Sequence, residues 1–231
     1  MIITPDTLIS EIVTKNYKAS EIFKKYEIDF CCNWNRPLNE VCKAKNLDTN
    51  EIINKLTSSM SNDSWNTIDF TSWPVDLLID YIVKKHHRYI REKTPEIINY
   101  LEKISRVHGE NHQELIEVEK EFKASIKSLN PHLEEEENII FPQINNLFNN
   151  PSSVDKVAFK KLIAIKMQEH DVEWERFRTI SKLTNNYTVP KDWCNTYRVS
   201  LALLKEFEND LHLHIHIESN ILFPKALEII K

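Results

Sequence analysis

Apolar residues recur every three to four positions along most of the chain, the spacing that gathers them on one face of an α-helix. Beyond a polar stretch at residues 58–72 the pattern is long, and it predicts helices at about 75–106, 112–147, 153–183 and 191–230. Long helices with short connections predict an antiparallel four-helix bundle. Pro131 and Pro142 fall within the second helix and Pro224 within the fourth, so we expect kinks or helix ends at these prolines.

The first 60 residues predict a smaller helical unit. Shorter amphipathic patterns indicate a helix that starts near Pro5, followed by helices at 20–26, 37–45 and 49–56. Residues 58–72 are rich in Ser, Asn, Asp and Thr and lack helical periodicity, which is typical of a linker. The predicted organisation is all-α: a small helical domain at residues 1–60, a linker at 61–73 and a bundle at 74–231.

Composition excludes several classes of protein. Gly109 is the only glycine in 231 residues, so the glycine-rich phosphate loops of Rossmann and P-loop folds are excluded. The net charge of −5 argues against a nucleic-acid partner. The sequence has no apolar run of about 18 residues to span a membrane, and its first residues do not resemble a signal peptide. Four cysteines, two of them adjacent, do not form a disulfide framework, so we expect a cytoplasmic protein.

An internal repeat carries the candidate chemistry. Residues 132–142 and 214–224 both follow the pattern H-x-x-x-E-x-N-I-I/L-F-P, 82 residues apart. Histidine and glutamate four positions apart share a helix face and can reach one metal ion. Apolar residues continue that face, so both pairs are expected to point into the bundle. Carboxylates and imidazoles are costly there unless they are paired or bind a metal.

The preceding helix of each predicted hairpin supplies a matching histidine. His87 lies 45 residues before His132, and His170 lies 44 residues before His214, each with apolar neighbours at helical spacing. A lone histidine on an apolar face is usually a hydrogen-bonded core residue, and residues 134–137 alone could be a solvated acidic surface. The combination of matched motifs and matched offsets instead predicts one metal site formed by His87, His132, Glu136, His170, His214 and Glu218.

The predicted donor set indicates two metal ions. Four histidines and two glutamates exceed the needs of one tetrahedral zinc ion and suit two first-row ions. If each glutamate bridges the ions and each ion takes two histidines, a bridging oxide or hydroxide would be a fifth ligand and about one position per ion would stay open. We therefore expect two iron ions with an oxo or hydroxo bridge, and manganese is an alternative at the same ligands.

Residues 75–230 resemble the hemerythrin-like di-iron bundle, and the whole chain resembles the repair of iron centres (RIC) family of iron–sulfur cluster repair proteins. Besides the two repeats, the resemblance rests on residues 80–83 leading to His87, on 107–109 and on 169–171. The N-terminal unit of this family carries an Asp-Phe/Tyr-Cys-Cys-Gly-Gly turn and a later cysteine. Here the turn contains Cys31 and Cys32 without the two glycines, and Cys42 follows.

The resemblance implies a function and assigns the residues. It implies repair of iron–sulfur clusters damaged by nitrosative or oxidative stress, through supply of iron. It makes the six residues the iron ligands, with Glu136 and Glu218 as the bridging carboxylates. The implied partners are damaged iron–sulfur proteins and a reductant, and the implied assembly is a homodimer. A protein that binds or senses O₂ or NO is an alternative function, as is an enzyme that reduces NO.

The other histidines and cysteines have competing interpretations. His86 competes with His87 as a ligand, and the matched offsets favour His87. His212 and His216 point away from His214 along their helix, so we expect them to lie around the site or at the surface. His108, Gly109 and His112 fall near a predicted helix end, and they are either part of a capping turn with Gly109 just past the helix or functional residues. Cys31 and Cys32 are either a redox or transfer pair or small buried residues, and Cys194 is expected to be structural.

Overall fold

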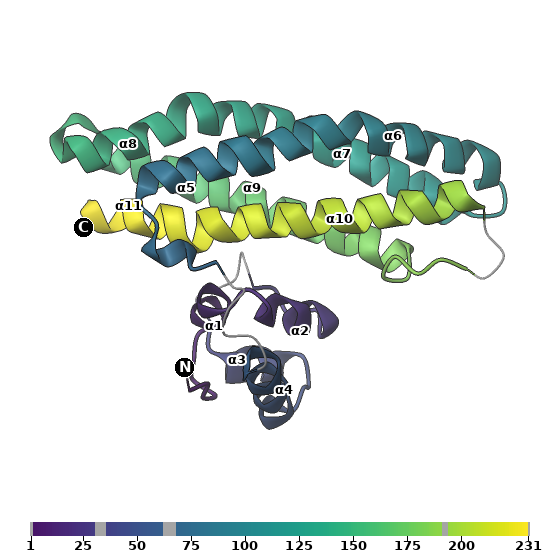
Figure 1. Ribbon diagram of the computed structural model, residues 1–231, viewed down its shortest axis with the longest axis horizontal. Coiled ribbons are helices and arrows are strands. Elements are labelled where there is room, and N and C mark those ends of the chain that lie inside the picture. Colours follow the sequence, from purple (N-terminus) through teal and green to yellow (C-terminus); the bar gives the residue numbers. More distant parts are fainter. Residues whose placement is uncertain (1, 31–35, 62–67, 191–193, 231) are drawn as a thin grey trace.

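The computed structural model describes residues 2–30, 36–61, 68–190 and 194–230, and within these ranges it contains helices but no β-strand. The expected all-α class is therefore confirmed. Figure 1 shows a long bundle, with the short N-terminal helices on the side of the bundle where α10 lies. None of the described helices is long and apolar enough to cross a membrane.

The N-terminal unit consists of short helices that pack through small apolar faces. Residues 2–30 and 36–61 contain α1 (Ile9–Lys15), α2 (Ala19–Lys25), α3 (Leu38–Ala44) and α4 (Thr49–Ser61). The last of these extends beyond the predicted end at residue 56 into the polar stretch expected to be a linker. The hydroxyls of Thr57 and Ser58 donate to the carbonyls of Ile53 and Asn54, four residues earlier, so these polar side chains bond within the helix.

The bundle is formed by long helices, several of them interrupted by short π-helical segments. In chain order the described elements are η1 (Phe70–Ser72), α5 (Val75–Tyr81), η2 (Ile82–His87), α6 (Arg88–His108), α7 (Gln113–Glu135), η3 (Glu136–Ile140), α8 (Phe141–Asn149), η4 (Pro151–Ser153), α9 (Lys156–Leu183), α10 (Asn195–Ile217), η5 (Glu218–Leu222) and α11 (Phe223–Ile229). Helix α6 packs on α7 and α10, and α9 packs on α7 and α10. This is the predicted four-helix arrangement.

The π-helical segments η3 and η5 explain how the helices accommodate Pro142 and Pro224. The amide of Phe141 donates to the carbonyl of Glu136, five residues earlier, and the amide of Phe223 donates in the same way to Glu218. Pro142 and Pro224 follow directly, at the start of the next helix, where a missing amide proton costs least. Pro131, in contrast, lies inside α7 and does not end it.

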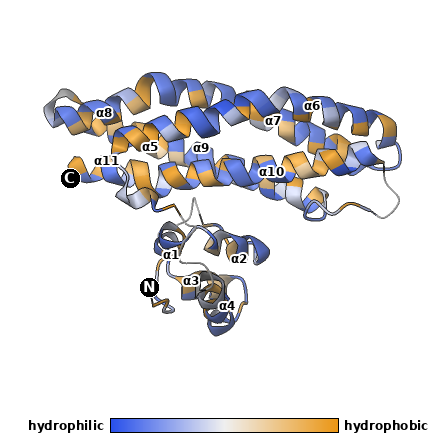
Figure 2. Ribbon diagram, viewed as in Figure 1, coloured by the Kyte–Doolittle hydropathy of each residue, from blue (hydrophilic) through white to orange (hydrophobic). Residues whose placement is uncertain are grey.

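The apolar core is arranged as two clusters among the described residues. One cluster fills the bundle on the α6–α7 loop side and continues into the N-terminal unit, and the other fills the end formed by α5, α8 and α11. Figure 2 shows the corresponding alternation of hydrophobic and hydrophilic residues along the helices. On α10 and η5 the first cluster ends at Ile215 and the second begins at Ile217, between His214 and Glu218. The candidate ligands therefore lie where the two clusters meet.

Gly109 caps α6 in a different way from the one expected. Glycine at a helix end usually adopts a left-handed conformation, whereas Gly109 has a right-handed φ of −62°. A Cβ atom at this position would lie 2.3 Å from the carbonyl oxygen of Ser105 and 3.1 Å from the side chain of Ile116. Close approach of the chain, rather than a positive φ, requires glycine at this turn.

Candidate metal centre

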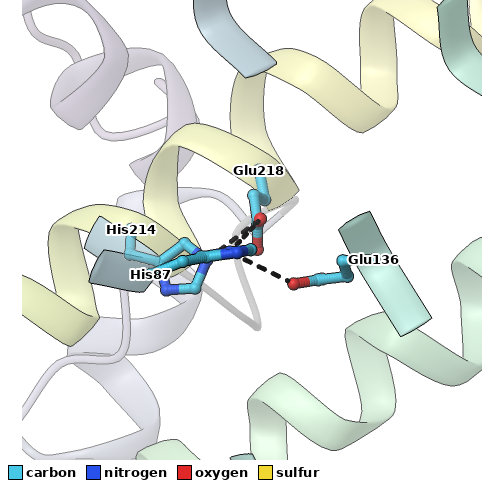
Figure 3. A group of neighbouring side chains, drawn as sticks. All are labelled: His87, Glu136, His214 and Glu218. Carbon is cyan, nitrogen blue, oxygen red and sulfur yellow. Dashed lines mark hydrogen bonds and ion pairs between the residues drawn. The ribbon is translucent and has the colours of Figure 1, made fainter. Parts of the chain in front are cut away.

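The structure brings the six predicted side chains together in the interior of the bundle. They form two overlapping groups that share both glutamates, one with His87 and His214 and the other with His132 and His170. All six are buried, with at most 5% of any of them exposed. Figure 3 shows the first group, in which the carboxylates approach His87 from different helices.

Each pair of imidazoles has the spacing of two ligands on one ion. The Nε2 atoms of His87 and His214 lie 3.1 Å apart, and those of His132 and His170 lie 3.2 Å apart. Nitrogens bonded at about 2.1 Å to a common ion, roughly at right angles, lie about 3.0 Å apart. The spacing of the two pairs is therefore compatible with two adjacent metal positions.

Each carboxylate spans both positions. Oε1 of Glu136 lies 3.1 Å from Nε2 of His132, whereas Oε2 lies 3.5 Å from Nε2 of His87. Glu218 repeats this arrangement, because its Oε1 lies 3.0 Å from Nε2 of His214 and its Oε2 lies 3.2 Å from Nε2 of His170. One oxygen of each glutamate thus faces one imidazole pair and the other oxygen faces the other pair, as a bridging carboxylate requires.

The outer nitrogens of two ligands are held by charged side chains. Nδ1 of His87 lies 2.7 Å from Oε1 of Glu137, and Nδ1 of His132 lies 2.6 Å from Oε2 of Glu169. A carboxylate at Nδ1 accepts its proton, which leaves the lone pair of Nε2 for a metal. The same carboxylate oxygens accept from Arg91 at 2.8 Å and from the buried Lys166 at 2.7 Å. Each of these imidazoles therefore forms a hydrogen bond with a carboxylate, which in turn accepts a hydrogen bond from a cationic side chain.

The remaining two imidazoles are held differently. Nδ1 of His170 lies 2.9 Å from the hydroxyl of Ser219, and Nδ1 of His214 has no hydrogen-bond partner among the described residues. Each imidazole pair thus combines one ring whose Nδ1 contacts a carboxylate with one whose Nδ1 does not. Sequence reasoning missed Glu137, Glu169 and Ser219 as partners. Their one signal is that each lies directly beside a candidate ligand in the sequence.

The electrostatics of the cluster favour charged carboxylates. Burial and the negative charge of Glu218 would raise the pKa of Glu136, but His132 and His170 outweigh them and hold the pKa at about 2. The pKa of Glu218 is likewise well below its usual value, because His214 and His170 outweigh its burial. Burial opposes the charged form of His132, yet Glu136 and Glu169 raise its pKa to about 10. A metal cation can take the place of these buried protons.

A first-row metal pair fits these residues. All four carboxylate oxygens of Glu136 and Glu218 are buried, and each lies 3.0–3.5 Å from an imidazole nitrogen. Buried carboxylates are strongly unfavourable unless positive charge neutralises them, and either protonated imidazoles or metal cations can supply that charge. Imidazole nitrogen and carboxylate oxygen together suit iron, manganese and related ions.

The structure separates the remaining histidines from the cluster. Nδ1 of His86 lies 3.0 Å from Oδ2 of Asp210, and the ring stacks parallel to that of His214. His212 and His216 are each 2% exposed, so a surface position for them is wrong. They face the N-terminal unit, where His212 packs near Phe30.

The cysteines lie at three separate places in the chain. Cys31 and Cys32 fall outside the described residues, but the carbonyl of Phe30 just before them accepts from Nδ2 of Asn220 at 3.3 Å. Cys42 is buried in the N-terminal core, and burial raises the pKa of its thiol. Cys194 is exposed at the start of α10, with its Sγ 3.4 Å from Nε2 of His108.

Comparisons with known proteins agree with this geometry. A family model described as a hemerythrin HHE cation binding domain matches residues 78–226, and a model of a domain of unknown function (DUF542) matches residues 5–60. A probable iron–sulfur cluster repair protein of Haemophilus influenzae is 34% identical over 221 residues, 95% of this chain and 96% of the relative. The iron–sulfur cluster repair protein YtfE of Yersinia pseudotuberculosis is 32% identical over 210 residues, 91% of each chain.

The fold and the buried histidine–glutamate cluster define a hemerythrin-like cation-binding bundle. Within that class, the similarity extends over both the bundle and the N-terminal unit. The chain belongs to the family of iron–sulfur cluster repair proteins.

Proposed function

We propose that this protein is a di-iron protein that repairs iron–sulfur clusters damaged by nitrosative or oxidative stress, and that it does so by supplying iron. The observation that carries the proposal is the pair of carboxylates, Glu136 and Glu218, each of which spans two imidazole pairs at the centre of the bundle. The family relatives are named for cluster repair, which supports the same function.

In this proposal His87 and His214 hold one ion, His132 and His170 hold the other, and both glutamates bridge them. Iron bound there would supply redox chemistry and exchangeable coordination positions. The chain contributes a preformed donor set, because the partners of the outer imidazole nitrogens fix the direction of three of the four rings. The rings of Phe141 and Phe223 lie against His87 and His170 and keep that side of the site apolar.

The imidazoles also suggest how the protein can both retain and release its iron cargo. His87 and His132 are backed by carboxylates, which strengthen them as donors. His170 and His214 have no carboxylate behind them. One strong and one weaker imidazole at each position suits an ion that must bind and later leave.

The proposal also covers the cysteines and the domain organisation. We assign Cys31 and Cys32 a redox or transfer role. They belong to the small domain at residues 1–60, which the linker at 61–73 joins to the bundle at 74–231. The partners are damaged iron–sulfur proteins and a reductant, NO and O₂ are candidate small ligands, and the protein acts as a homodimer in the cytoplasm.

The experiment that tests the function is reactivation of a damaged enzyme. A hydratase whose [4Fe–4S] cluster has been damaged by peroxide is incubated with the iron-loaded protein, a reductant and, in parallel, an equal amount of free iron. Faster recovery than with free iron supports donation. The matched controls are Glu136→Gln, which should abolish the gain, and Glu134→Gln, exposed near the end of α7, which should keep it.

Gas binding is the second candidate, and the apolar rings beside the site favour it. Stoichiometric and reversible O₂ uptake by the reduced protein, with no reactivation of the hydratase, would replace donation with gas binding or sensing. Sustained formation of nitrous oxide from NO with a reductant would identify an NO reductase instead.

A further inference from the structure

A cleft lies between the N-terminal unit and the bundle, separate from the metal centre. Its volume is about 1010 Å³, at the upper end of the range for small-molecule sites. Residues of α2 form one wall and residues of α9 and α10 form the other, and Nζ of Lys24 spans the two walls to Oδ1 of Asn209 at 2.6 Å. Figure 1 shows α2 beside the bundle on the side where α10 lies.

The cleft carries an excess of positive charge although the whole chain is acidic. The described residues that line it include six cations, which are Lys18, Lys24, Lys25, Arg178, Lys182 and Lys205. The same residues include three carboxylates, Glu21, Glu27 and Glu208, and the net charge of the whole chain is −5. Arg178 also pairs with Glu175 on its own helix, which removes part of the excess. A concave surface with a surplus of cations attracts anions.

The cleft also contains a buried imidazole with no partner. His212 lines it, is 2% exposed, and neither of its ring nitrogens has a hydrogen-bond partner among the described residues. Its ring lies against Trp174, with the ring centroids 4.0 Å apart. A buried polar group without a hydrogen bond is unfavourable, so such a group calls for an explanation. A neutral imidazole offers one donor and one acceptor to a ligand.

The wall of the cleft is continuous with the helices that carry the metal centre. His212 lies two residues before His214 on α10, and Trp174 lies four residues after His170 on α9. His212 and Trp174 therefore belong to turns next to those of the ligands, but none of the residues that line the cleft is a candidate ligand. A molecule in the cleft would contact the N-terminal unit and both helices at once.

We propose that this cleft binds a small organic oxyanion, a molecule that carries a carboxylate or a phosphate group. The lysines of both walls hold the anionic group, and His212 forms a hydrogen bond with a polar group of the ligand where it lies against Trp174. Binding clamps the N-terminal unit to the bundle. The site is independent of the metal ions and of their identity.

Titration of the full-length, metal-loaded protein tests the site. Glutarate serves as the carboxylate probe and glycerol 3-phosphate as the phosphate probe, and isothermal titration calorimetry measures the dissociation constant of each. Metal content is measured after every titration, so that chelation is not taken for binding. The variants are Lys182→Glu and His212→Leu, and the matched control is Lys160→Glu, an exposed lysine elsewhere on α9.

We expect saturable binding of at least one probe, and the preferred probe identifies the anionic group. Lys182→Glu should weaken binding about tenfold, the equivalent of one charge-assisted hydrogen bond. His212→Leu should weaken binding as well, with metal content unchanged, and Lys160→Glu should have little effect. The proposal is overturned if neither probe binds saturably, if Lys160→Glu weakens binding as much as Lys182→Glu, or if His212→Leu binds like the wild type. These results leave the cluster-repair function untouched, because reactivation of the hydratase is measured separately.

Discussion

The Nε2 atoms of His87 and His214 lie 3.1 Å apart although 127 positions separate the two residues in the sequence. Two unprotonated imidazole nitrogens at this distance repel each other, and a shared proton or a shared cation removes the repulsion. The same contact recurs between His132 and His170. The bundle thus holds two donor pairs in a geometry that a bound metal ion would stabilise.

If Glu136 and Glu218 bridge two ions as proposed, replacing either one should affect both metal positions. Glu136→Gln and Glu218→Gln each remove a charge that faces both imidazole pairs, so each variant should fall from about two metal ions per chain to less than one. Metal analysis by mass spectrometry, together with the visible absorption of the di-iron pair, measures the change. Glu134→Gln, an exposed change on α7 two residues before Glu136, should keep both ions. Loss of one ion only in either variant would contradict bridging.

The carboxylates behind the ligands should control affinity at single positions. Glu137→Gln weakens the support of His87, and Glu169→Gln weakens that of His132. Replacement of such a partner typically costs about 10–100-fold in metal affinity, so each variant should bind one ion less tightly and the other normally. Competition with a chelator of known affinity measures this as a biphasic loss. Equal weakening of both ions would show that these carboxylates act on the whole cluster.

Replacing His87 and replacing its neighbour His86 should have different effects on metal binding. His87→Ala removes a donor from one pair and should leave at most one ion per chain. His86 bonds to Asp210 and stacks on His214 without joining either donor group, so His86→Phe should keep two ions. It should still destabilise the fold by about 1 kcal/mol, because Asp210 loses its contact with His86 and keeps the longer ion pair with Lys85, at 3.4 Å. Metal analysis combined with urea unfolding separates the two effects, and loss of an ion in His86→Phe would reassign the ligand.

A buried glutamate outside the cluster should make stability depend on pH. Glu173 accepts from the hydroxyl of Ser125 at 2.6 Å, and burial raises the pKa of its carboxyl group, against the opposing effects of Ser125, Ser128 and Arg176. The folded protein therefore holds this proton more tightly than the unfolded chain, so this group lowers stability as the pH rises through about 4.5 toward its folded pKa. Glu173→Gln should remove that loss and leave the protein more stable than the wild type at pH 7.

Urea unfolding of both proteins between pH 4 and pH 7, in the same metal state, measures the difference. Glu175→Gln is the matched control, because Glu175 is exposed on the same helix. A free-energy difference between Glu173→Gln and the wild type that does not change with pH would contradict the prediction.

The sequence by itself determined the helical class and the candidate ligands. Helical spacing of apolar residues is a local signal, so it located the long helices to within a few residues of their observed ends. The repeat at residues 132–142 and 214–224 placed each His–Glu pair on one helix face, because a helix returns to the same face after four residues. Matched offsets then added His87 and His170. Two local details differed from expectation. Helix α4 continues past its predicted end at residue 56, and Gly109 has a right-handed backbone at the end of α6.

Only the tertiary structure decided how these residues meet. No periodicity reveals that Glu137 lies behind His87 or that Glu169 lies behind His132, because each pair is brought together by packing of different helices. The same packing buries His212 against Trp174 and forms the cleft beside α2. The sequence fixes which side chains share a face of one helix, whereas distances between helices depend on how their apolar faces pack together.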